Sequence, residues 1–393
     1  MGRCLGAVLL LLWWVAPLSI NGERSRLWYT KDPDRIGQHL PTVFVLSLPA
    51  RFLAEPSSDV NFHSSQHHHE SLFAHWLANS YEFVVADSGQ ADLFFLPARN
   101  PTGQPYGGHH SDAWWNDIDK ELNRIATDAS YPTFALDRTM FASSFPTATL
   151  RKIHAGVRNI ADVRYMRLDN DLTVNGRDVF VPYIIDPSRW RPNTLKNVTQ
   201  AELSGQDKIF FLSAVCREAY WDVHRIWRTK LYNQWRDQPN SMVGYSVAEA
   251  VYEHAWKNSH FCVILPGDTG STAKLYMAIF AGCIPVIFLS FRRALPFIDY
   301  LDWSLFSVPV LKDIINHKAA MAQLAAHLRA IQQDAHRLAA YKTALAEVAP
   351  LFDFGKRDFP SAYHLILLEF ARDYQPKPRN NATAKTELAG YLL

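Results

Sequence analysis

The sequence predicts an α/β fold arranged as two domains, and three observations support this prediction. The chain has 393 residues, 48% of them hydrophobic, which is enough for two ordinary cores. Between residues 42 and 182, short apolar segments alternate with helical patterns, as they do in doubly wound parallel sheets. A second alternating series begins at residue 208, after a polar and turn-rich stretch at residues 186–206 that we interpret as the linker.

The first domain is expected to span residues 40–190. Residues 91–97, ADLFFLP, are apolar without interruption, which is typical of a strand buried on both faces of a parallel sheet. The spacing of apolar residues predicts a helix at residues 70–77, and a second helix is expected at residues 114–126. The expected strands of this domain are residues 42–52, 81–86, 91–97, 131–136 and 177–182.

The second domain is expected to span residues 206–345. It begins with an apolar strand at residues 208–214, KIFFLSA, and continues with helices at residues 221–235 and 247–257. Residues 261–289 then have the pattern of a strand, a loop, a helix and a further strand.

The start of the helix in this last segment is a candidate anion site. Turn-forming and hydroxyl residues lead up to Thr272, and helix formers then extend to Gly282, which ends the helix. Unpaired backbone N–H groups at a helix start, together with the positive end of the helix dipole, favour an anionic group at residues 270–272. Lys274 adds a cation one turn inside the helix, so a nucleotide diphosphate would suit the segment.

An ordinary βαβ unit with a capped helix explains the same pattern equally well. The spacing of the loop matches neither the dinucleotide-binding fingerprint nor the P-loop. The segment alone therefore leaves both interpretations open.

The last part of the chain is expected to be helical and then disordered. Between Met321 and Leu338, apolar residues recur every three or four positions, which predicts one amphipathic helix. Residues 346–375 are expected to form a C-terminal helical segment that ends with a helix at residues 362–372. The polar residues 376–393, rich in Pro, Asn and Thr, are expected to be disordered.

An apolar run at the amino end predicts entry into the secretory pathway. Residues 1–22 are interpreted as a signal peptide or a signal anchor, because the run is long for the first and short for the second. The chain is expected in the lumen of the Golgi or the endoplasmic reticulum, as a single-pass type II membrane protein, or as a secreted protein. Glycosylation motifs at Asn197 and Asn381 agree with a lumenal chain.

Charge and cysteine content exclude several classes of site. The formal net charge is +2 without a dense basic run, so nucleic acid is not an expected partner. The four cysteines form neither a disulfide framework nor a zinc pattern. Cys262 and Cys283 flank apolar strands and are interpreted as small buried hydrophobic residues. The alternative is one oxidised pair that includes Cys216.

Four sequence blocks match those of one known family. They occur in the same order as in that family, and the gaps between them have comparable lengths. The blocks are VFVLSLPARF at residues 43–52, ADLFFLP at 91–97, DVFVPY at 178–183, and residues 259–286 with FCVILPGDTGS and GCIPV. Through these blocks the chain resembles the exostosin family of glycosyltransferases, in its plant and algal form. The resemblance covers nearly the whole chain.

The resemblance implies a GT-B-type fold with two facing Rossmann-like domains and parallel sheets, the first for the acceptor and the second for the donor. It implies an inverting glycosyltransferase that needs no metal or other cofactor and transfers a sugar from a nucleotide-diphosphate sugar to a glycan or glycoprotein. Homo-oligomers and hetero-oligomers both stay open. The family's donor-site positions fall on Arg228, Asp268, Gly270, Ser271, Thr272 and Lys274. The cations among them would neutralise the departing diphosphate.

An inverting reaction also needs a base that takes the proton of the acceptor hydroxyl. His110 and Asp112, which follow a pair of glycines in the first domain, are the candidates, and Asp137 is a comparable one.

Two patterns resemble metal ligands but favour other interpretations. The histidines at residues 67–69 are adjacent, so their side chains point in different directions, as in a solvated loop. Asp169 and Asp171 precede Asn175 and Gly176, which is typical of a turn. A metal-dependent transferase centred on these two aspartates is the hypothesis that a chelator would test.

Two of the chain's departures from the family replace acidic residues. Met277 and Ile298 stand where the family has acidic residues, one of which could bind ribose hydroxyls. This departure motivates an alternative function, a non-catalytic exostosin-like scaffold or chaperone of another glycosyltransferase.

Overall fold

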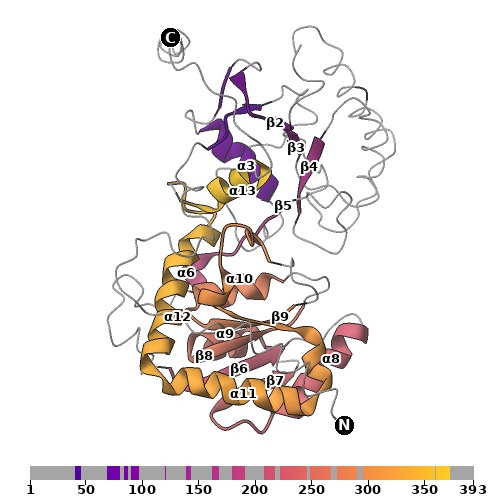
Figure 1. The fold of residues 1–393 in the computed structure, drawn as a ribbon, viewed down its shortest axis with the longest axis vertical. Helices are drawn as coiled ribbons and strands as arrows, with labels where there is room; N and C mark the ends of the chain where they lie inside the picture. The colour runs from indigo at the N-terminus through magenta and orange to yellow at the C-terminus, as the bar shows by residue number, and fades with distance from the viewer. Residues whose placement is uncertain are drawn as a thin grey trace.

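Two parallel sheets form the cores of two α/β domains, which lie one above the other along the long axis of the molecule (Figure 1). The computed structural model describes residues 40–45, 69–79, 84–86, 90–96, 120, 139–142, 162–167, 179–190, 208–216, 222–245, 248–266, 272–289, 295–358 and 360–371. Within these residues each sheet has five strands, and all neighbouring strands are parallel. The predicted α/β class with two parallel-sheet domains is confirmed.

The amino-terminal sheet has the strand order β1-β2-β3-β4-β5, so each strand lies beside the next strand of the sequence. Helix α3 (His69–Ala78) packs against it, with 5.5 Å between the ring centroids of Phe73 and Phe95. The strands are β1 (Val43–Val45), β2 (Leu93–Leu96), β3 (Thr139–Ala142), β4 (Asp162–Arg167) and β5 (Val179–Phe180).

The more apolar elements of this domain lie where the sequence predicts them. Helix α3 and strands β1, β2 and β5 lie where they were expected, although the strands are shorter. Val84, in the expected strand at residues 81–86, forms a single parallel bridge with Val43. Strands β3 and β4 were not predicted, because segments such as DVRYMR mix charged and apolar residues. The expected strand at residues 131–136 lies outside the described residues, as does the expected helix at residues 114–126 except for Lys120.

The carboxyl-terminal sheet has the strand order β10-β9-β8-β6-β7. Its strands are β6 (Phe210–Cys216), β7 (Ser241–Tyr245), β8 (Ser259–Ile264), β9 (Ile284–Leu289) and β10 (Val308–Leu311). Helices α8 (Asp222–Trp235), α9 (Glu249–Lys257) and α10 (Ala273–Phe280) connect β6 to β9. These helices and strands β6, β8 and β9 confirm the predicted order, whereas the edge strands β7 and β10 were missed.

The direction of the crossovers reverses between β6 and β8. From β6 the connection through α8 leads to β7 on one side, and from β8 the connection through α10 leads to β9 on the other side. Because parallel crossovers are right-handed, α8 and α10 lie on opposite faces of the sheet. Ligands of open α/β sheets bind beyond the carboxyl ends of the strands at such a reversal.

The apolar stripe predicted as one helix belongs to two helices, so this prediction is wrong. Helix α11 (Lys318–Gln333) ends at Asp334, whose backbone is extended, and α12 (Ala335–Val348) begins after it. The carboxylate of Asp334 accepts a hydrogen bond from the Arg337 backbone N–H at 3.0 Å. Such a local bond competes with helix continuation. The spacing of three and four residues continues across the break and therefore conceals it.

Replacing Asp334 with alanine is expected to lower the free energy of unfolding by about 1 kcal/mol, because α12 loses its N-cap acceptor. Asp334 is exposed, so no core contact is lost with it. Chemical denaturation of the two proteins measures the difference. Asp334→Asn keeps a capping oxygen and should unfold like the wild type, whereas an alanine variant of unchanged stability would contradict the capping role.

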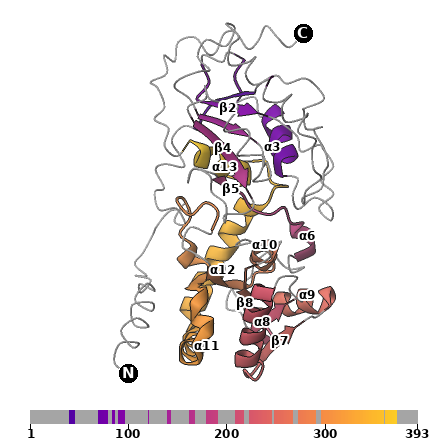
Figure 2. The ribbon, with the colours of Figure 1, turned by 90° about the vertical axis from the view of Figure 1, so that its right-hand side faces the viewer.

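The expected C-terminal helical segment returns to the first domain. Helix α12 leads upwards from the second domain, and α13 (Ala362–Phe370) lies beside α3 (Figures 1 and 2). The rings of Trp76 and Tyr363 stack with 5.0 Å between centroids and 7° between planes. The Trp76 Nε1–H donates to the Arg357 carbonyl at 3.4 Å, and the Tyr300 hydroxyl donates to the Leu368 carbonyl at 2.6 Å. These contacts tie α13 and the segment before it to the rest of the fold.

The start of the expected linker is bound to the second domain. Helix α6 (Pro187–Trp190) places the Arg189 guanidinium 3.0 Å from the Glu253 carboxylate on α9. The rings of Trp190 and Trp256 pack with 5.7 Å between centroids. The chain therefore enters the second domain before residue 191, earlier than the predicted boundary at residue 206.

Cys262 in β8 and Cys283 just before β9 form a disulfide bond, with 5.7 Å between their Cα atoms. Their interpretation as free hydrophobic residues is therefore wrong, and neither remains for Cys216. Both are fully buried, as expected. Parallel pairing sets Cys262 opposite Pro285, which brings Cys283 within bonding distance. The pairing of β8 with β9 is not visible in the sequence.

The ends of the chain lie outside the described residues. This applies to the expected signal segment at residues 1–22 and to the expected tail at residues 376–393. Among the helices that the structure describes, none combines the length and the apolar character needed to span a bilayer.

Candidate functional site

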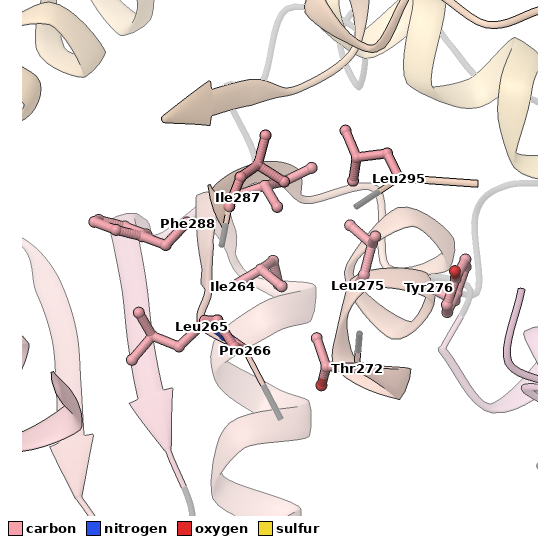
Figure 3. A pocket seen from close by; sticks show the side chains of 10 residues that line it. Ile264, Leu265, Pro266, Thr272, Leu275, Tyr276, Ile287, Phe288 and Leu295 are labelled. Carbon is pink, nitrogen blue, oxygen red and sulfur yellow. The ribbon is translucent and has the colours of Figure 1, made fainter. Parts of the chain in front are cut away.

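A small pocket lies at the carboxyl ends of β8 and β9, beside the first turn of α10 (Figure 3). Its walls are mainly apolar, with Ile264 from β8, Ile287 from β9 and Leu275 from α10, and Thr272 contributes a hydroxyl. Its volume of about 20 Å³ has room for about one water molecule. The pocket marks the edge of the sheet at which the sequence predicted an anion site.

Thr272 begins α10 and already engages part of the helix start. Its hydroxyl accepts a hydrogen bond from the Lys274 backbone N–H at 3.3 Å, and its carbonyl accepts one from the Leu275 N–H at 3.2 Å. Within the described residues, no hydrogen bond uses the backbone N–H of Ala273. An anion at this helix start would therefore meet the Ala273 amide first and compete with the Thr272 hydroxyl for the Lys274 amide.

Helix α10 is firmly anchored under this site. Tyr276 is buried, and its ring lies 6.2 Å from Tyr183 and 5.7 Å from Phe352, centroid to centroid. Burial, followed by the neighbouring Tyr183, raises the pKa of Tyr276 well above its usual value, so its phenol stays neutral. Gly282 ends the helix with a φ of 64°, as the sequence predicted for this position. These contacts anchor α10, so its amino end has a fixed position.

Tyr276 was not singled out from the sequence. An aromatic residue among apolar neighbours in a helix looks like any core residue, and only the fold brings Tyr183 and Phe352 to it.

Arg228 lies on α8, on the other side of the sheet reversal from α10. Its exposed fraction is 8%, so it is a buried cation. The preceding Trp227 ring holds the Lys312 ammonium 4.4 Å from its centroid. The structure thus places Thr272 and Lys274 together at the start of α10. Arg228 lies on α8, the other helix that begins at this edge of the sheet.

The remaining predicted site residues lie outside the described residues. They are the donor-site residues Asp268, Gly270 and Ser271, the base candidates His110, Asp112 and Asp137, and the metal-like patterns at residues 169–171 and 67–69, except for His69, which is the first residue of α3. Within the part of the chain that the structure describes, no group of three or more His, Cys, Asp or Glu side chains could hold a metal ion.

The two departures from the family pattern have a structural role. Met277 and Ile298 are partly buried and pack against the hydrophobic core. Ile298 has no hydrogen-bond acceptor and the thioether of Met277 is only a weak one, so a donor would have to find a strong acceptor for its ribose hydroxyls elsewhere.

Residues 37–323 match the model of the family described as the Exostosin GT47 domain. Two proteins of Arabidopsis thaliana, both named probable glycosyltransferases, are 32% identical over 85 residues and 30% identical over 105 residues. These matches cover 21% and 26% of this chain, and only 18% and 20% of the two relatives.

Solved structures of low sequence identity also align with the chain. Anabaena Alr3699/HepE, crystallised with UDP, aligns with a TM-score of 0.39 and 7% identity over 85% of this chain and 99% of its own. An α1,3-fucosyltransferase aligns with a TM-score of 0.33 and 11% identity over 86% of this chain and 93% of its own. Both scores are below 0.5, so the fold class stated above rests on the strand pairing alone.

Proposed function

Because this chain belongs to the exostosin GT47 family, we propose that it is a glycosyltransferase that moves a sugar from a nucleotide-diphosphate sugar to a glycan or glycoprotein acceptor. One observation carries the proposal beyond kinship. The start of α10 opens at the carboxyl edge of a parallel sheet, next to the point where the crossovers reverse. Ligands of open α/β sheets bind at such points, and a helix start there favours a phosphate group.

In the proposed mechanism, the diphosphate of the donor binds at the amino end of α10. The Ala273 amide, the hydroxyl and amide groups at Thr272 and the Lys274 cation would contact it, with Asp268, Gly270 and Ser271 of the preceding loop. As the bond between sugar and diphosphate breaks, negative charge develops on the leaving group, and Lys274 and Arg228 would stabilise it. These cations offer the charge compensation that a divalent ion supplies in other enzymes.

The acceptor hydroxyl would attack the sugar from the face opposite the diphosphate, which inverts the anomeric centre. His110 or Asp112 of the first domain would take its proton. The pocket beside α10 has mainly apolar walls, so the base is not expected among its residues.

The disulfide bond supports a lumenal location. Disulfides such as Cys262–Cys283 persist in oxidising compartments and are rare in the cytosol. We therefore propose that the protein acts in the lumen of the Golgi or endoplasmic reticulum, with residues 1–22 as its signal peptide or membrane anchor, or that it is secreted.

A non-catalytic scaffold or chaperone is the second candidate function. Met277 and Ile298 favour it, because they fill with apolar side chains two positions where the family has acidic residues. A scaffold of this kind needs no donor, so it would bind neither uridine nor guanosine diphosphate.

The test is turnover of a panel of nucleotide sugars with mixed cell-wall and proteoglycan acceptors, with and without EDTA. We expect one donor to be consumed at a rate that EDTA leaves unchanged, and NMR of the product to show inversion at the anomeric carbon. Loss of activity in EDTA would contradict the metal-independent mechanism and favour Asp169 and Asp171 as metal ligands. No turnover, together with no binding of either diphosphate by calorimetry, would favour the scaffold.

A further inference from the structure

Two described segments of the chain cross between the domains, and both lie against helix α10. The first crossing is residues 181–186, between β5 of the first domain and α6, which is bound to the second. The second crossing begins with the 3₁₀ helix η5 (Ala349–Phe352), which follows α12 and leads to α13 beside α3. Helix α10 contacts both α6 and η5, and it lies at the end of the second domain that faces the first (Figures 1 and 2).

One side chain of α10, Tyr276, packs against both crossings. Its ring centroid lies 6.2 Å from that of Tyr183 in the first crossing and 5.7 Å from that of Phe352 in the second. All three rings are buried. Tyr276 is therefore the common contact of two segments that nearly the whole second domain separates in the sequence.

The surroundings of this contact are anchored in the second domain. Phe352 also packs against Phe297 and Trp303, with 6.0 Å and 5.5 Å between ring centroids. At the other end of α10, the Lys208 ammonium donates a hydrogen bond to the Ala281 carbonyl at 3.3 Å. Helix α10 thus has contacts along its whole length, and the crossings rest on a well-supported part of the domain.

We propose that Tyr276 is a positioning residue for the transfer reaction, because its ring sets where the first domain stands relative to the donor helix. The inference rests on the proposed function, in which the diphosphate binds at the start of α10 and the base belongs to the first domain. Tyr276 lies in the first turn of α10, so its position relative to the diphosphate is fixed. Since both crossings contact its ring, the same side chain also fixes the position of the first domain relative to the diphosphate.

Replacing Tyr276 with leucine should separate donor binding from turnover. Leucine keeps the helix propensity and an apolar side chain, but it removes the ring that both crossings contact. The backbone N–H groups of the first turn remain, so the dissociation constant of uridine diphosphate should stay close to the wild-type value. The kcat should fall roughly tenfold to a hundredfold, because a displacement of about 1 Å between reacting groups has an effect of this size.

Three further variants separate this role from a loss of packing. Tyr276→Phe keeps the ring and should keep the wild-type kcat. Phe211→Leu removes a buried ring of β6 that packs against Phe261, so it should lower the melting temperature without lowering kcat where the protein is folded. Tyr183→Leu removes the partner ring in the first crossing and should lower kcat. Its double variant with Tyr276→Leu should be no slower than the slower single variant, because both changes remove the same contact.

Hydrogen exchange gives a measurement that does not depend on turnover. In Tyr276→Leu, the backbone amides of residues 181–186 and 353–358 should exchange faster than in the wild type, whereas Phe211→Leu should leave them unchanged. Unchanged exchange in Tyr276→Leu would overturn the proposal, and so would a wild-type kcat in this variant. A dissociation constant that rises as much as kcat falls would also overturn it, because Tyr276 would then act on the donor site alone.

Failure of the proposed function would look different. In that case the wild type turns over no donor of the panel and binds no diphosphate. Faster exchange in Tyr276→Leu, and not in Phe211→Leu, would still support the role of Tyr276 in holding the two domains in position.

Discussion

Replacing Lys274 with alanine should raise the dissociation constant of uridine diphosphate, or of the nucleotide that the donor panel identifies, roughly tenfold to a hundredfold. Hydrogen bonds between a cation and phosphate oxygens contribute about 1.5–3 kcal/mol, which corresponds to this range. Lys274 lies in the first turn of α10, and its own amide remains capped by Thr272 in the variant. Calorimetric titration of the purified protein measures the change.

The matched control for this prediction is Lys230→Ala on α8. The Lys230 ammonium donates to the Asn316 side chain at 2.7 Å, so its loss should leave nucleotide affinity unchanged. Lys274→Arg keeps the charge and should lose much less affinity than Lys274→Ala. Wild-type affinity in Lys274→Ala, with unchanged melting temperature, would place the diphosphate elsewhere.

Arg228 needs a different variant, because it is 8% exposed and packs inside the domain. Arg228→Ala would remove packing as well as charge, so a loss of affinity could follow from a loss of stability. Arg228→Met keeps most of the buried stem and separates the two effects. We expect it to weaken nucleotide binding while the melting temperature stays within a few degrees of the wild type.

Removing the disulfide bond should have the largest effect on stability. The double variant Cys262→Ala, Cys283→Ala is expected to lose about 3 kcal/mol of unfolding free energy, because the bond closes a loop with a sequence separation of 21 residues. For a domain of this size, the melting temperature should fall by roughly 6 to 12 °C. The loop contains α10, so the domain that carries the proposed donor site depends on this bond.

Thermal unfolding of the wild type in reducing agent gives an independent measure of the same bond. It should reproduce the melting temperature of the double variant. Cys216→Ala is the control and should leave the cross-linked peptide of Cys262 and Cys283 intact in mass spectra without reduction. If the double variant has the same melting temperature as the wild type, the bond adds nothing to stability.

Much of the second domain could be predicted from local patterns. The run from Phe261 to Leu265 is apolar and β-branched, and Thr272 and Gly282 mark the two ends of α10. Strand, cap and helix end are each set by residues within a few positions of one another. The predicted anion site follows from the same local chemistry, because the backbone N–H groups that would bind the anion all belong to the first turn of the helix.

Elements without a strong local pattern were missed or misplaced. Strand β7, SMVGY, lies at the edge of the sheet and contains glycine, so its hydrophobicity is weak. The break at Asp334 was hidden because the three- and four-residue spacing crosses it. The burial of Arg228 was not predicted, since burial of a long cation depends on helix packing that the sequence does not show.

The sequence by itself determined the α/β class, the family and the location of the candidate anion site, because these depend on periodicity, capping residues and ordered sequence blocks. Only the tertiary structure decided which distant residues meet. It paired Cys262 with Cys283 and stacked Tyr363 on Trp76. These contacts follow from strand order and from the return of α13 to the first domain, and no local pattern of residues specifies either.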